Sequence, residues 1–81
     1  MEKNLHFQYY NSNALLLINK KGQIRILYTP FRVLCVIATG SIPLDSWVYV
    51  EEVWADHQDR LQFVIYGLPY LYQHFYLPIT F

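Results

Sequence analysis

The chain has 81 residues, 15% of them charged and 19% aromatic, and its six basic and six acidic side chains balance. A chain of this length provides one small core, near the lower limit at which hydrophobic burial alone stabilises a fold. The balanced charge argues against nucleic-acid binding, because proteins that neutralise phosphates carry a surplus of Lys and Arg.

The first 28 residues predict an N-terminal arm followed by a β-hairpin. Residues 5–10 predict a short strand or an ordered arm, and residues 11–13, Asn-Ser-Asn, predict a turn. Residues 14–18 and 23–28 are apolar runs separated by a short polar loop that ends in Gly22, which can supply a positive φ.

Residues 31–37 predict the next strand, after Pro30 interrupts the hydrogen-bond ladder. One face of this strand would carry Phe31, Val33, Cys35 and Ile37, and the other would carry Arg32, Leu34 and Val36. Both faces are apolar apart from the arginine, whereas a strand exposed on one side alternates more cleanly. We therefore expect the second face to be covered by the N-terminal hairpin or by another molecule.

Residues 47–54 and 61–66 predict a second hairpin, because both runs are rich in β-branched and aromatic residues and flank a polar turn. Val48 and Val50 should point inward, with Trp47 and Tyr49 outward. The doublet Glu51-Glu52 predicts a bulge. Residues 69–77 predict one helical turn and a short last strand. The fold class is therefore all-β, with five to seven short antiparallel strands.

From residue 31 to residue 77 the order of elements resembles an SH3-like barrel: a strand, a loop, a tight hairpin, a helical turn and a closing strand. Residues 45–50 resemble the entry into the second strand of that fold, and residues 56–60 would be the loop between the following strands. Residues 67–72 are similar to the stretch in which a proline and a tyrosine three residues later line the ligand groove, here Pro69 and Tyr72. Residues 31–35 lack the tyrosine-rich acidic motif of signalling SH3 domains, so we do not expect recognition of proline-rich peptides.

Catalytic and metal-site interpretations are weaker than structural ones. Cys35 with His6, His57 or His74 could form a nucleophile and base, or a metal site, but the cysteine lies in an apolar strand and no ligand pair is closely spaced. The acidic residues between 51 and 59 are better explained as protection of a strand edge. We therefore predict no enzyme activity, no metal and no cofactor.

The single cysteine and the lack of an apolar leader predict a cytoplasmic protein without a signal peptide. No apolar run approaches the roughly 20 residues that span a bilayer, so we expect no membrane association.

The surplus of aromatic residues is the main functional signal, because Trp and Tyr dominate binding hot spots. The predicted partner-binding residues are Trp47, Tyr49, Trp54, Pro69, Tyr70 and Tyr72. We expect a protein-interaction module of 81 residues that binds a protein partner or forms a homo-oligomer such as a homodimer. The alternatives are a small barrel that stacks single-stranded nucleic acid on its aromatics, and a small-ligand-binding protein with an aromatic pocket.

Overall fold

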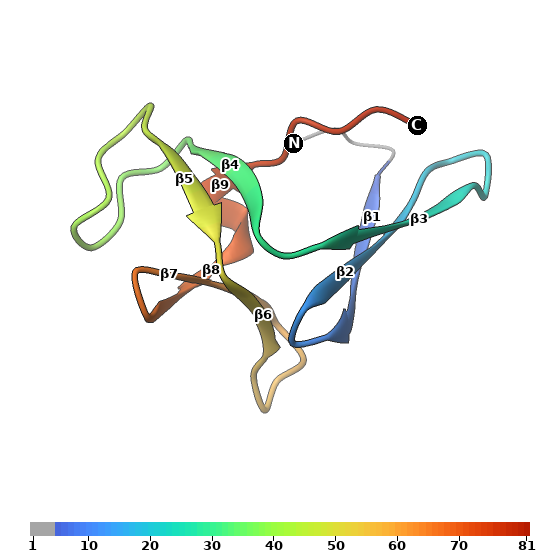
Figure 1. The fold of residues 1–81 in the computed structure, drawn as a ribbon, viewed down its shortest axis with the longest axis horizontal. Helices are drawn as coiled ribbons and strands as arrows, with labels where there is room; N and C mark the ends of the chain where they lie inside the picture. Colours follow the sequence, from blue (N-terminus) through green and yellow to red (C-terminus); the bar gives the residue numbers. More distant parts are fainter. Residues whose placement is uncertain (1–4) are drawn as a thin grey trace.

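The computed structural model describes residues 5–81 and shows an all-β protein with three three-stranded antiparallel sheets (Figure 1). In chain order the elements are β1 (His6–Asn11), β2 (Ala14–Ile18), β3 (Ile24–Tyr28), β4 (Phe31–Cys35), β5 (Trp47–Val50), β6 (Glu52–Ala55), β7 (Leu61–Ile65), β8 (Leu68–Leu71), the 3₁₀ turn η1 (Tyr72–His74) and β9 (Phe75–Tyr76). The sheets have the strand orders β1-β2-β3, β5-β4-β9 and β6-β7-β8. The all-β prediction is confirmed, whereas the predicted number of strands was too low.

The N-terminal sheet contains the predicted hairpin, β2 and β3, with β1 as a third strand on its other side. The Asn19 side chain organises the turn, because its Oδ1 accepts hydrogen bonds from the backbone N–H groups of Lys21 and Gln23 at 3.0 and 2.9 Å. Gly22 has φ +82°, as its place at the end of the loop predicts. Residues 1–4 of the predicted arm lie outside the described residues.

The run 47–54 divides into two strands at Glu51, where a bulge was predicted. Val50 and Val53 are both fully buried although they are three residues apart, so the alternation of inward and outward side chains restarts at Glu51. The Glu51 N–H donates to the carbonyl of Val64 at 2.8 Å. The chain thereby passes from the sheet of β4 to the sheet of β7, which accounts for one of the strands that the sequence did not predict.

The other additional strand is β8. Tyr66 and Gly67 both have positive φ, 53° and 76°, and form a two-residue turn that leads directly from β7 into β8. Pro69 lies inside β8 because this strand is at the edge of its sheet, where a missing N–H costs no ladder hydrogen bond. The predicted helical turn is present as η1 and the predicted last strand as β9.

Strand β4 is shorter than predicted. The backbone N–H groups of Val36 and Ile37 both donate to the carbonyl of His74, at 2.9 and 3.2 Å, so the chain bends after Cys35. Ile37 is consequently 52% exposed and does not share the buried face of Phe31, Val33 and Cys35. The expectation for Ile37 was therefore wrong.

All three sheets contribute to one hydrophobic core. Phe63 on β7 lies near its centre, with ring centroids 5.5 Å from Phe31 and 6.1 Å from Phe75. Leu15 and Leu17 of the N-terminal sheet are fully buried in the same cluster. In residues 5–81 no polar or charged residue is fully buried. The N-terminal sheet is therefore packed into the fold and does not form a separate unit.

Candidate partner-binding surface

The outer side of the sheet β5-β4-β9 gathers aromatic and apolar side chains from three strands. Leu34 is paired with Trp47 on β5 and with Tyr76 on β9, and Arg32 is paired with Tyr49 on β5. Directly paired residues of antiparallel strands project from the same side of a sheet. These five residues, Arg32, Leu34, Trp47, Tyr49 and Tyr76, are called the aromatic face below.

The aromatic face is open in this structure. Trp47 is 46% exposed, Tyr49 61% and Tyr76 38%. On the opposite side of the same strands Val33, Val48 and Val50 are buried, so the predicted inward and outward directions of β5 are confirmed. Arg32 on the outer side of β4 is exposed, and Val36 just after the strand is 40% exposed, so the N-terminal hairpin does not cover this side there.

Arg32 brings a positive charge to the aromatic face. Its guanidinium carbon lies 4.5 Å from the centroid of the Trp47 ring, within the range of a cation–π interaction. The contact places the guanidinium over the indole, beside the apolar side chains of the aromatic face. A partner with apolar side chains and a carboxylate or carbonyl oxygen would complement this arrangement.

Trp54 is exposed but belongs to β6, in a different sheet from Trp47 and Tyr49. Its indole Nε1–H donates to Glu52 Oε1 at 3.0 Å, and the ring is 44% exposed. The neighbouring Glu51 accepts a hydrogen bond from the Gly67 N–H at 3.1 Å. Both carboxylates of the doublet therefore bind groups of their own chain.

Tyr70 and Tyr72 are half-buried and pack against the core. Tyr70 lies edge-on to Phe75 with ring centroids 6.3 Å apart. Its ring is also so close to Gly40 that a Cβ there would come within 2.9 Å of Tyr70 Cε1. Tyr72 lies edge-on to Phe7 of β1 at 5.9 Å and to Phe63 at 6.4 Å.

Of the six predicted residues, the structure thus brings together Trp47 and Tyr49. It places Trp54 on β6 and the exposed Pro69 on β8, both in the other sheet β6-β7-β8. Sequence reasoning did not select Arg32, Leu34 or Tyr76 as site residues. The signal for the first two was the apolar second face of residues 31–37, whereas the place of Tyr76 depends on its pairing with Leu34 across 42 positions of the chain.

The Cys35 thiol is fully buried, and its Sγ lies 3.2 Å from the carbonyl oxygen of Ile37, to which it can donate. Nδ1 of His74 is buried without a hydrogen-bond partner, and His6 and His57 are exposed. Over residues 5–81 no group of three His, Cys, Asp or Glu side chains is placed to hold a metal ion.

Hydrogen bonds to the carboxylate lower the pKa of Asp56. Its carboxylate accepts hydrogen bonds from the backbone N–H of Arg60 at 3.0 Å and of Gln58 at 2.8 Å. It also accepts from Arg60 Nε at 2.8 Å and from Gln62 Nε2 at 3.0 Å. The backbone donor of Arg60 contributes most to lowering the pKa of Asp56 from 3.8 to about 2, and the other donors act in the same direction against desolvation. The ionised Asp56 carboxylate therefore stabilises the turn between β6 and β7 through these hydrogen bonds.

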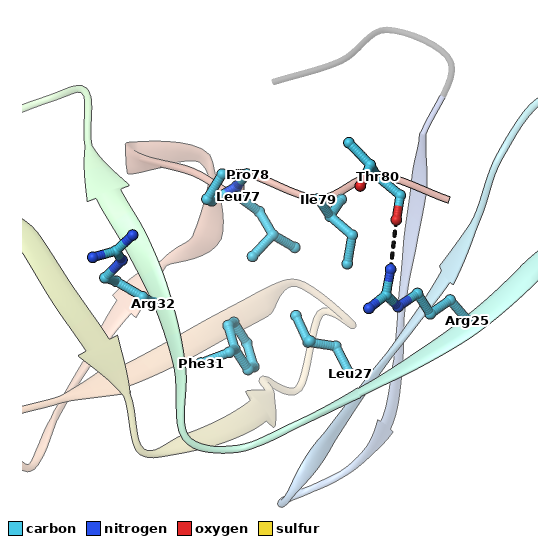
Figure 2. A pocket seen from close by; sticks show the side chains of 8 residues that line it. All are labelled: Arg25, Leu27, Phe31, Arg32, Leu77, Pro78, Ile79 and Thr80. Carbon is cyan, nitrogen blue, oxygen red and sulfur yellow. Dashed lines mark hydrogen bonds between the residues drawn. The ribbon is translucent and has the colours of Figure 1, made fainter.

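A hollow of about 320 Å³ lies between β3, the start of β4 and the C-terminal tail (Figure 2). Its walls are largely apolar, with Leu27 and Phe31 on one side and Leu77 and Ile79 on the other. The Arg25 guanidinium at its end donates to the carbonyl of Thr80, which ties the tail to β3. The residues that line the hollow include no acid, histidine or cysteine.

Comparisons with protein-family models, curated proteins and solved structures find no match to this chain. Among residues 5–81 no helix has the length and apolar character needed to cross a bilayer.

Proposed function

We propose that this protein is a non-catalytic interaction module that binds a protein partner through the aromatic face. The observation that carries the proposal is the open cluster of Trp47, Tyr49, Leu34 and Tyr76, with Arg32 lying on Trp47. Aromatic residues and arginine are enriched at protein interfaces, and Trp, Tyr and Arg are the commonest hot-spot residues. We place the module in the cytoplasm, because a single cysteine provides no internal disulfide.

We further propose that residues 31–77 form an SH3-like barrel. Support comes from the order of elements, in which β4 is followed by a loop, the hairpin β5–β7, the turn η1 and the closing strand β9. The pairing of β9 with β4 brings the two ends of this segment together. No described strand belongs to two of the three sheets, so the barrel would be an open one.

Recognition of proline-rich peptides is not part of this proposal. In the resemblance to SH3 domains, Pro69 and Tyr72 would line the peptide groove. Here Tyr72 packs edge-on against Phe7 from the chain's own β1. Part of the Tyr72 ring is therefore already covered within the molecule.

The proposal can be tested with a photo-cross-linking residue in place of single tyrosines. A benzoyl-phenylalanine at position 49 lies on the aromatic face, whereas one at position 66 is comparably exposed in the turn between β7 and β8. We expect a discrete protein adduct in the source cells at position 49 but not at position 66. Trp47→Ser in the same chain should abolish the adduct at position 49.

Equal adducts at the two positions, or an adduct only at position 66, would contradict the proposal. An adduct to nucleic acid at position 49 would instead support base stacking on the aromatic face. In that case quenching of Trp47 fluorescence by single-stranded oligonucleotides should fall steeply with added salt.

A further inference from the structure

The outer side of the N-terminal sheet carries a second apolar surface, which differs from the aromatic face. Register places Ile24 opposite Ile18, Ile26 opposite Leu16 and Tyr28 opposite Ala14. These pairs point away from Leu15 and Leu17, the buried leucines of β2. Ile24 and Tyr28 are 65% and 64% exposed, and none of these residues is charged. This aliphatic face comprises Leu16, Ile18, Ile24, Ile26 and Tyr28.

The register of β3 against β2 determines which backbone groups of β3 point toward β2 and which point outward from the sheet edge. The Thr29 N–H donates to Asn13 at 2.9 Å and the Asn19 N–H to Gln23 at 3.1 Å, at the two ends of the β2–β3 ladder. Hydrogen-bonded pairs alternate with non-hydrogen-bonded pairs in an antiparallel ladder, so residues 25 and 27 bond to β2. Ile24, Ile26 and Tyr28 therefore direct their N–H and C=O groups outward.

This outward edge is unpaired in the described part of the chain. β3 is the last strand of its sheet, and within residues 5–81 no backbone hydrogen bond outside the β2–β3 ladder involves residues 24–28. Natural edge strands are usually protected by proline, bulges or charges. β3 has a regular register and no proline, and its one charge, Arg25, lies on the opposite face, where it binds Thr80 (Figure 2).

We propose that β3 pairs with β3 of a second copy of this chain, antiparallel about a two-fold axis at Ile26. In this register Ile26 faces Ile26 of the other copy and each Ile24 faces Tyr28, so all three outward-directed residues of both copies find hydrogen-bond partners. The side-chain pairs are β-branched with β-branched and β-branched with aromatic, which are favourable across strands.

Charge and symmetry favour β3 of a second copy over a strand of an unrelated protein as the pairing partner. Arg25 would face Leu27 of the other copy, so no like charges oppose each other, and the chain has no net charge to repel its copy. The pairing uses the β3 edges of both copies and is therefore closed. Five paired residues bury far less than the roughly 800 Å² per partner of a standard interface, so we expect a weak dimer that depends on concentration.

Disulfide trapping tests the register directly. In a hydrogen-bonded antiparallel pair the Cα atoms are about 5.5 Å apart, within disulfide range, so Ile26→Cys should form a dimer on mild oxidation. Ile24→Cys alone should not, because the two copies of position 24 lie about 13 Å apart along the strands. Ile24→Cys mixed with Tyr28→Cys should form the heterodimer, and the wild-type chain, whose Cys35 is buried, should form none.

Sedimentation velocity from micromolar to submillimolar concentration provides the second measurement. Ile26→Lys would place two lysines opposite each other and should weaken dimerisation by about tenfold or more. Tyr49→Ser, on the aromatic face, should leave dimerisation unchanged. A wild-type chain that is monomeric throughout this range, or equal trapping at positions 24 and 26, would overturn the proposal.

A dimer that Tyr49→Ser abolishes and Ile26→Lys preserves would also overturn it. That result would assign self-association to the aromatic face and leave the proposed function standing. Conversely, the absence of an adduct at position 49 would contradict the proposed function but would not contradict the pairing of β3.

Discussion

The N-terminal sheet and the strands β4–β9 contribute to one core but present different surfaces to solvent. Inside, Leu15 and Leu17 of β2 pack in the same cluster as Phe63 and Phe75. Outside, β2 and β3 present a mainly aliphatic surface whose edge is unpaired within residues 5–81, whereas the sheet β5-β4-β9 is aromatic and carries Arg32. Aliphatic edge strands suit backbone pairing, and aromatic faces with a cation suit side-chain recognition. A low content of charge therefore leaves two kinds of exposed apolar surface on one small protein.

Deleting residues 1–28 should destabilise the protein more than any other change considered below. The deletion removes Leu15 and Leu17, each worth about 1.5–3 kcal/mol of burial, and uncovers Tyr72. Small domains have total stabilities of about 5–15 kcal/mol, so we expect residues 29–81 to lose their fixed structure. The measurement is the dispersion of the ¹H–¹⁵N NMR spectrum. A well-dispersed spectrum from the truncated chain would show that the N-terminal sheet is an appendage.

Two neighbouring leucines of β2 lie on opposite sides of the N-terminal sheet, so substituting each one tests one side. Leu17→Ala removes a fully buried side chain and should lower the free energy of unfolding by about 2–5 kcal/mol. Leu16→Ala, on the aliphatic face, should cost about 1 kcal/mol or less, because Leu16 is only half-buried. Urea denaturation of both variants gives the comparison. Equal losses would mean that both sides of β2 are covered.

The alternation of valines and aromatics in residues 47–50 was sufficient to predict which side chains face inward, because β5 has one buried and one exposed side. The sequence also predicted Gly22 at the turn, since the positive φ there favours glycine. The strand β8 was missed because Tyr66 is an unusual residue at positive φ and Pro69 ordinarily argues against a strand.

The composition of the candidate site depended on contacts between distant residues. The partner of Tyr76 is Leu34, and the packing partner of Tyr72 is Phe7. Neither pairing has a local signature, because each depends on how sheets are arranged after the chain has folded. The aromatic surplus was therefore readable from the sequence, but the division of those aromatics between core and surface was not.

The smallest expected effect concerns the turn between β6 and β7. The pKa of Asp56 is lowered to about 2 in the folded protein from 3.8, so ionised Asp56 stabilises the fold above pH 3.8. This contribution is lost as the pH falls through about 2. We expect Asp56→Asn to lower the unfolding temperature at neutral pH and to reduce its further decrease between pH 4 and pH 2. Thermal unfolding by circular dichroism is the measurement, with exposed Asp59→Asn as the control. An equal decrease in Asp56→Asn and wild type would contradict the role of the carboxylate.

The reactivity of the single cysteine, Cys35, can be used to measure local opening of the structure around β4. Cys35 has no solvent-accessible surface, and its Sγ lies against the carbonyl oxygens of Ile37 and Ile42, so a thiol reagent can react only after the packing around it opens. The rate of labelling with such a reagent therefore reports how often the structure opens around the end of β4, the central strand of the sheet that carries the aromatic face. A bound partner that bridges β5 and β9 should lower the rate of Cys35 labelling without contacting the sulfur.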